Sequence, residues 1–184
     1  MIEAELKARV SDPDALRDRL RRLAGEELSV YRDTYYDRLD RHLTTQGREL
    51  RLRVVENSGV QRVLLTYKEP PADESSGSKP EHETTVADPA VIDVIFQALG
   101  LEHLVSFEKH CVNYRFTAKG RDMLATVATV PEIDGTFIEL ETIVPEREVK
   151  ASLSDIRAVL HELGITDEDL TTEQYTDAVM RRHH

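Results

Sequence analysis

The chain has 184 residues, enough for one domain and few for two. Hydrophobic residues make up 40% of it, so it can bury a core, while its net charge of -11 disfavours bulk binding to nucleic acid, whose phosphates attract basic surfaces. No apolar run is long enough to cross a bilayer, and the N-terminus lacks a signal-peptide pattern. The single cysteine, Cys111, excludes an internal disulfide and a thiolate zinc cluster. We therefore expect a cytoplasmic protein with neither a nucleic-acid nor a membrane partner.

The first third of the chain is rich in strand patterns. Residues 1–10 alternate between apolar and charged side chains, and this period of two predicts a half-buried strand. Asp12-Pro13 predicts the start of a helix that closes near Gly25, because an acidic cap and a proline suit the first turn. Further strands are predicted over 30–38, 48–56 and 60–68, and Asn57-Ser58-Gly59 indicates a tight hairpin.

The remaining elements follow an exposed loop, predicted over 70–80 from its prolines, serines and glycine. Strand pattern resumes at Glu81, and Asp88-Pro89 opens a second helix that ends at Gly100. Strands over 104–117, 122–130 and 136–144 precede two helices, over 148–163 and 167–180. About eight antiparallel strands with a few covering helices indicate one α+β domain over 1–184, its sheet closed or strongly curved.

The second face of these strands carries charges that sort by strand. Glu3 and Glu5 share one side of the first strand, and Glu139 and Glu141 share one side of the last. On a one-sided sheet such residues would simply face water. If the sheet closes with these faces inward, the carboxylates suit a hard divalent cation, and the cations suit a polyphosphate. The cations are Lys7, Arg51, Arg53, Lys68 and Lys109.

Several motifs together resemble a known family. Glu3-Ala-Glu5-Leu-Lys7 matches the ExExK signature that opens CYTH proteins, the triphosphate tunnel metalloenzymes. Further matches arrive in the family's order and span most of the chain. They are Glu49-Leu-Arg51-Leu-Arg53, Leu65-Thr-Tyr-Lys68, Glu81-His-Glu83, Glu108-Lys109, Phe137-Ile-Glu139-Leu-Glu141 and the late Glu173-Gln-Tyr175.

The resemblance implies an eight-stranded antiparallel β-barrel, or tunnel, that binds a triphosphate with Mg²⁺ or Mn²⁺. By position, it implies that the metal ligands are Glu3, Glu5, Glu139 and Glu141. The implied phosphate-binding residues are Lys7, Arg51, Arg53, Lys68 and Lys109, with Glu81 and Glu83 orienting these cations. The implied catalytic residues are Lys7, Glu5 and Glu139, of which Lys7 would modulate the proton of the attacking group.

The chain departs from the family pattern at two positions. Cys111 stands where the family often has an arginine, and Arg115, on the same side of that strand, could substitute as a substrate-binding cation. Thr129 stands where an acidic residue is common, with Glu132 and Asp134 nearby.

Within the family, the chain is most similar to the class IV adenylyl cyclase subgroup. The similarity lies in the Thr-Tyr-Lys68 segment, the loop after it, Glu81-His-Glu83 and the aromatic strand at Tyr35-Tyr36. The expected activity is therefore conversion of ATP to cyclic AMP and pyrophosphate, and a homodimer is consistent with that subgroup. Alternatives are an inorganic or thiamine triphosphatase, a non-catalytic polyphosphate or nucleotide-binding protein, and a cage repurposed for another organic di- or triphosphate.

Overall fold

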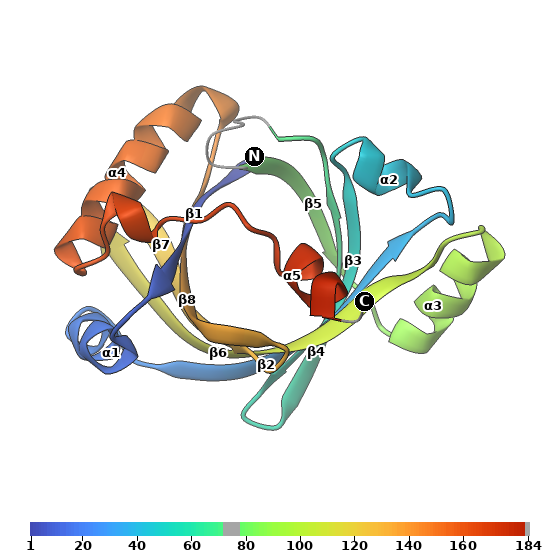
Figure 1. Cartoon of the computed structure of the whole chain (residues 1–184), viewed down its shortest axis with the longest axis horizontal. Helices are drawn as coiled ribbons and strands as arrows, with labels where there is room; N and C mark the ends of the chain where they lie inside the picture. The colour runs from blue at the N-terminus through green and yellow to red at the C-terminus, as the bar shows by residue number, and fades with distance from the viewer. Residues whose placement is uncertain (72–77, 183–184) are drawn as a thin grey trace.

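The computed structural model describes residues 1–71 and 78–182, and its centre is a closed antiparallel barrel of eight strands (Figure 1). The order around the barrel is β1-β5-β4-β3-β2-β6-β7-β8. The predicted closed α+β architecture is thus confirmed. The strands are β1 (Ile2–Val10), β2 (Glu27–Asp37), β3 (Glu49–Asn57), β4 (Val60–Lys68), β5 (Lys79–Thr85), β6 (Glu102–Ala118), β7 (Arg121–Val130) and β8 (Ile133–Val144).

The largest apolar core lies outside the barrel, between its wall and two helices. Helices α1 (Pro13–Arg21) and α4 (Val149–Glu162) flank β1, β7 and β8 (Figure 1). Leu20 of α1 and Ile156 of α4 are fully buried in this cluster, as is Leu140 of β8. This core takes the outer face of β1, β6, β7 and β8, and their other face lines the lumen.

Turns and caps form where the sequence predicts them. Ser58 and Gly59 both have positive φ, 49° and 79°, which suits the two-residue hairpin between β3 and β4. The Asp12 carboxylate accepts a hydrogen bond from the Ala15 amide at 3.0 Å and begins α1. Asp88 caps α3 (Pro89–Ala98) in the same way.

The single helix predicted over 167–180 is wrong. A 3₁₀ turn, η2 (Asp167–Asp169), is followed by an extended segment and then by α5 (Tyr175–Arg182). Leu170 bridges to Ala8, and the Thr171 amide donates to the Lys7 carbonyl at 2.9 Å, so pairing with β1 overrides helix propensity here. This segment crosses one opening of the barrel (Figure 1).

Two smaller features complete the fold. The short helix α2 (His42–Thr45) was not predicted; Asp37 holds it by accepting hydrogen bonds from the Leu43 and Thr44 amides, each at 2.9 Å. The middle of the predicted loop, 72–77, lies outside the described residues. No helix in the described parts of the chain is long and apolar enough to cross a membrane.

Candidate functional site

The barrel encloses a cavity of about 400 Å³, and every site residue predicted from the sequence lines it. The reason is the period of two of a β-strand: successive side chains point to opposite faces, so alternate residues of each strand project inward. The predicted residues on this wall are Glu3, Glu5, Lys7, Arg51, Arg53, Lys68, Glu81, Glu83, Lys109, Arg115, Glu139 and Glu141. Charged side chains from the first and last strands therefore meet inside the molecule and do not coat its surface.

Three carboxylates form an acidic corner, defined as Glu3, Glu5 and Glu141. Glu5 pairs with Glu141 across β1 and β8, and one oxygen from each of the three residues lies within 4.8 Å of the others. Burial, together with the negative charges of Glu3 and Glu139, raises the pKa of Glu141 to about 8. Burial and neighbouring carboxylates likewise raise the pKa of Glu5. Clustered oxygen donors whose charges repel one another fit a hard divalent cation such as Mg²⁺ or Mn²⁺.

Glu139 has a different environment from the acidic corner. Lys109 Nζ lies 3.0 Å and 2.9 Å from its two carboxylate oxygens. Burial opposes the ionisation of Glu139, but the charges of Lys109 and Lys7 and the hydrogen bonds from Lys109 and Tyr175 together outweigh burial, and the pKa of Glu139 is lowered. The structure therefore presents Glu139 as the partner of a cation, and its role as a metal ligand stays a prediction.

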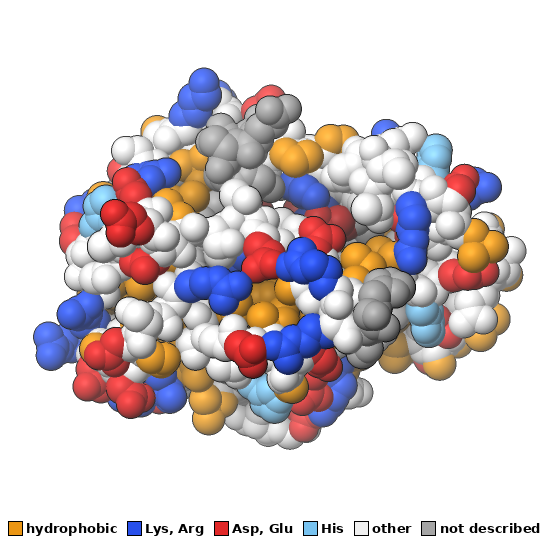
Figure 2. Space-filling model, viewed as in Figure 1, with side chains coloured by type: hydrophobic (Ala, Val, Ile, Leu, Met, Phe, Trp, Pro, Cys, Tyr) orange, Lys and Arg blue, Asp and Glu red, His pale blue; other side chains and the backbone are white. Residues whose placement is uncertain are grey.

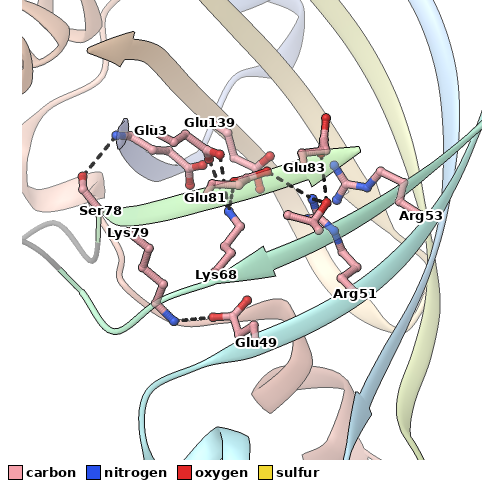
Figure 3. Close-up of polar contacts among 12 residues, drawn as sticks. Glu3, Glu49, Arg51, Arg53, Lys68, Ser78, Lys79, Glu81, Glu83 and Glu139 are labelled. Atoms are coloured by element: carbon pink, nitrogen blue, oxygen red, sulfur yellow. Dashed lines mark hydrogen bonds and ion pairs between the residues drawn. The ribbon is translucent and has the colours of Figure 1, made fainter. Parts of the chain in front are cut away.

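Next to the acidic corner, Lys68 of β4 points toward two carboxylates, one on the neighbouring strand β5 and one on β1, the next strand along (Figure 3). Its Nζ lies 2.9 Å from Glu81 and 3.4 Å from Glu3. Arg51 lies 4.0 Å from Glu81 and donates to the Thr66 hydroxyl at 3.3 Å. Burial and the charge of Glu3 raise the pKa of Glu81 to about 7. Glu81 thus lies between two cations, and its role in orienting them stays a prediction.

Arg53 is held by a carboxylate that the sequence analysis did not select, Asp33 on β2. Two hydrogen bonds of 2.6 Å join the guanidinium to both oxygens of Asp33, and the Tyr31 ring lies 4.6 Å from the guanidinium carbon. Burial opposes the charge on Asp33, but the charge and hydrogen bonds of Arg53, with the charges of Arg51 and Lys109, together outweigh burial and lower the pKa of Asp33 to about 2. The alternation of Tyr31, Asp33 and Tyr35 on β2 was the signal that could have revealed this inner face.

The C-terminal segment closes one end of the cavity. Tyr175 of α5 lies under two lysines, with Lys7 Nζ 4.3 Å and Lys109 Nζ 4.5 Å from its ring centroid. Lys7 Nζ also donates to the backbone carbonyl of Glu173. Burial lowers the pKa of Lys7 despite the carboxylates nearby. Outside the cavity Glu173 pairs with Arg9 at 3.0 Å. Figure 2 shows acidic and basic side chains next to one another around the middle of this face.

The two departures from the family pattern have different outcomes. Cys111 is buried, and burial raises the pKa of its thiol to about 11, so it is a neutral side chain where an arginine would supply positive charge. Arg115 lines the cavity at its mouth, with a side chain that is 64% exposed and 3.9 Å from Glu27. Thr129 is exposed, and the β7 residue paired with Glu139 is Thr126. Neither Glu132 nor Asp134 lines the cavity.

Comparisons with known proteins agree with this geometry. The family model of the CYTH domain matches residues 1–175. A Methanocaldococcus jannaschii protein named "putative adenylate cyclase" is 25% identical over 180 residues, which cover 96% of this chain and 98% of that protein.

Two solved structures share the fold. The PH1819 protein of Pyrococcus horikoshii has a TM-score of 0.83 at 24% identity, covering 98% of this chain and 99% of that one. The HpAC1 protein of Hippeastrum, described as an adenylyl cyclase candidate with a dominant triphosphatase activity, has a TM-score of 0.65 at 20% identity, covering 98% and 96%. With the family model matched over nearly its whole length, the chain belongs to the CYTH domain family, whose members act on triphosphates with divalent metals.

Proposed function

We propose that this protein is a metal-dependent enzyme acting on a nucleoside triphosphate, of the class IV adenylyl cyclase type, converting ATP to cyclic AMP and pyrophosphate. The observation that carries the proposal is the acidic corner facing a set of buried cations within one cavity. A polyphosphate and a divalent cation are the ligand pair that this distribution of charge complements.

Glu3, Glu5 and Glu141 would hold the divalent cation, with Glu139 as a further ligand once Lys109 turns to phosphate. When bound, Mg²⁺ or Mn²⁺ would neutralise phosphate oxygens and make the pyrophosphate a better leaving group. Arg51, Arg53, Lys68 and Lys109 would hold the phosphates, as would Arg115 at the mouth. Glu81 and Glu83 would orient these cations, because Glu81 contacts Lys68 and Glu83 accepts from Thr66, which in turn accepts from Arg51.

In the reaction, the ribose 3′-oxygen forms a bond to the α-phosphorus, and the bond from that phosphorus to the pyrophosphate oxygen breaks. The hydroxyl proton passes to Lys7 Nζ, whose pKa is lowered by burial, so that its neutral form is more accessible. Glu5 and Glu139 flank Lys7 on β1 and β8 and set its charge environment. Most of the rate acceleration would come from positioning and charge neutralisation.

A second candidate is a triphosphatase, in which water attacks the terminal phosphorus within the same cage. The activity described for the Hippeastrum structure favours keeping this alternative. A homodimer also stays a prediction, which analytical ultracentrifugation would test.

The test incubates purified protein with Mn²⁺ and either ATP or tripolyphosphate, and separates cyclic AMP from orthophosphate by chromatography. Cyclic AMP formation that is abolished by a chelator and by Glu141→Gln supports the cyclase. Orthophosphate alone supports the triphosphatase. The matched control is Glu168→Gln, an exposed glutamate outside the cavity. If the protein binds ATP or tripolyphosphate in a metal-dependent way but forms no product, both reactions are contradicted. The protein would then be a non-catalytic nucleotide- or polyphosphate-binding protein.

A further inference from the structure

A second cavity adjoins the lumen. This annex, defined by the residues around the β6–β7 hairpin and the end of β8, has a volume of about 730 Å³. It shares four lining residues with the lumen, namely Arg115, Leu124, Glu141 and Ile143. A ligand can therefore extend from the acidic corner into the annex, because Glu141 belongs to both.

The chemistry of the annex differs from that of the lumen. Its wall contains Leu124 and Ile143, whereas the lumen is lined mainly by charges. Arg121 lines the annex but not the lumen, and its charge is already paired: the guanidinium lies 2.8 Å from Asp155 and 3.2 Å from Glu148. This wall suits an uncharged organic group better than another phosphate.

The annex also provides polar atoms at one edge. The Thr117 hydroxyl and the Asp122 carboxylate lie 2.8 Å apart on the exposed side of the hairpin. An apolar wall with a few polar groups is typical of small-molecule sites, whose volumes are about 300–1,000 Å³. The annex is therefore large enough for a nucleoside-sized group.

We propose that the annex binds the organic group of the substrate, so that this site discriminates an organic triphosphate from inorganic tripolyphosphate. The inference rests on the proposed function and adds to it the place and the residues of that selectivity. The phosphate nearest the organic group would lie beside Glu141, and the rest of the chain would extend toward Lys68 and Lys109. Thr117, Leu124 and Ile143 would be specificity-determining residues that contact no phosphate.

The experiment compares ATP with tripolyphosphate, each with Mn²⁺, by steady-state kinetics and by titration calorimetry. Thr117→Trp fills the annex from an exposed position, and Ile143→Ala removes part of its apolar wall. For Thr117→Trp we expect the KM and Kd of ATP to rise about 10-fold, with those of tripolyphosphate unchanged. For Ile143→Ala we expect a rise of about 3-fold for ATP and a smaller one for tripolyphosphate.

The matched control is Thr129→Trp, which places the same bulk at an exposed strand position that lines neither the lumen nor the annex. It should change neither ligand's affinity. If both annex variants affect ATP and tripolyphosphate equally, or affect neither, the annex proposal is overturned while the proposed function stands. If the wild-type protein binds neither ligand in the presence of Mn²⁺, the proposed function and the annex proposal fall together.

Discussion

The two faces of β1 are built from alternate residues of one short segment, yet they have opposite character. On the outer face, Ala4 and Ala8 are fully buried beneath the covering helices. On the inner face, Glu3 and Glu5 belong to a crowded carboxylate cluster that burial alone would disfavour. The difference teaches that stability comes from the outer core and that the lumen is free to be electrostatically costly. Substitutions on the two faces should therefore separate activity from stability.

Two adjacent residues of β8, Leu140 on the outer face and Glu141 on the inner face, test this comparison most directly. The larger effect, on turnover, is expected for Glu141. Glu141→Ala removes a predicted metal ligand, so metal-dependent turnover should fall at least about 100-fold. The thermal midpoint of the metal-free protein should stay the same or rise, because carboxylate repulsion is relieved. Activity assays and thermal denaturation check both parts. Retention of full turnover would show that Glu141 is not part of the active site.

On the outer face, Leu140→Ala should have the reverse effect. Leu140 is fully buried in the core beneath α4, so its truncation should lower the free energy of unfolding by about 3 kcal/mol. Turnover per folded molecule should be unchanged. Denaturant unfolding gives the first quantity, and active-site titration the second. A stable but inactive variant would contradict the separation of the two faces.

One inner-face pair should nevertheless contribute to stability, and its effect depends on pH. The pKa of Asp33 is lowered from 3.8 to about 2. A lowered folded-state pKa means that the stabilisation is present above pH 4 and is lost as the pH falls toward 2. This stabilisation is about 2 kcal/mol. Unfolding of the wild type and of Asp33→Asn should therefore differ more at pH 6 than at pH 2.

The matched control for Asp33 is Asp18→Asn, whose side chain is 65% exposed. Its stability difference from the wild type should be small at both pH values. An Asp33→Asn difference that stays constant from pH 6 to pH 2 would argue against the Asp33–Arg53 pair as its source.

The smallest effect is expected at Cys111, a buried position with no charge at neutral pH. Because the pKa of its thiol is about 11, alkylation by iodoacetamide at pH 8 should be slow in the folded protein. Cys111→Ala should cost about 1 kcal/mol of stability and leave turnover within twofold. Rapid modification accompanied by inactivation would place Cys111 in the reaction after all.

The sequence was most informative where a local pattern repeats. Alternation placed Glu3, Glu5 and Lys7 on one side of β1, and the order of the motifs indicated which other strands carry inward charges. Asp33 was overlooked because one acidic residue between two tyrosines gives no charge pattern. Tyr175 belongs to one of the family motifs in the sequence. Its contact with Lys7 and Lys109, however, depends on the extended segment 170–174, where the sequence pattern predicts a helix.

By itself, then, the sequence determined the strands, their inward residues and the family, since a period of two depends only on neighbouring residues. The tertiary structure decided which charges meet: Glu141 joins Glu3 and Glu5, whereas Glu139 pairs with Lys109. It also decided that 170–174 crosses the barrel and that the annex opens beside Glu141. These features depend on strand register and barrel closure, which bring residues from opposite ends of the chain together, and no local pattern encodes them.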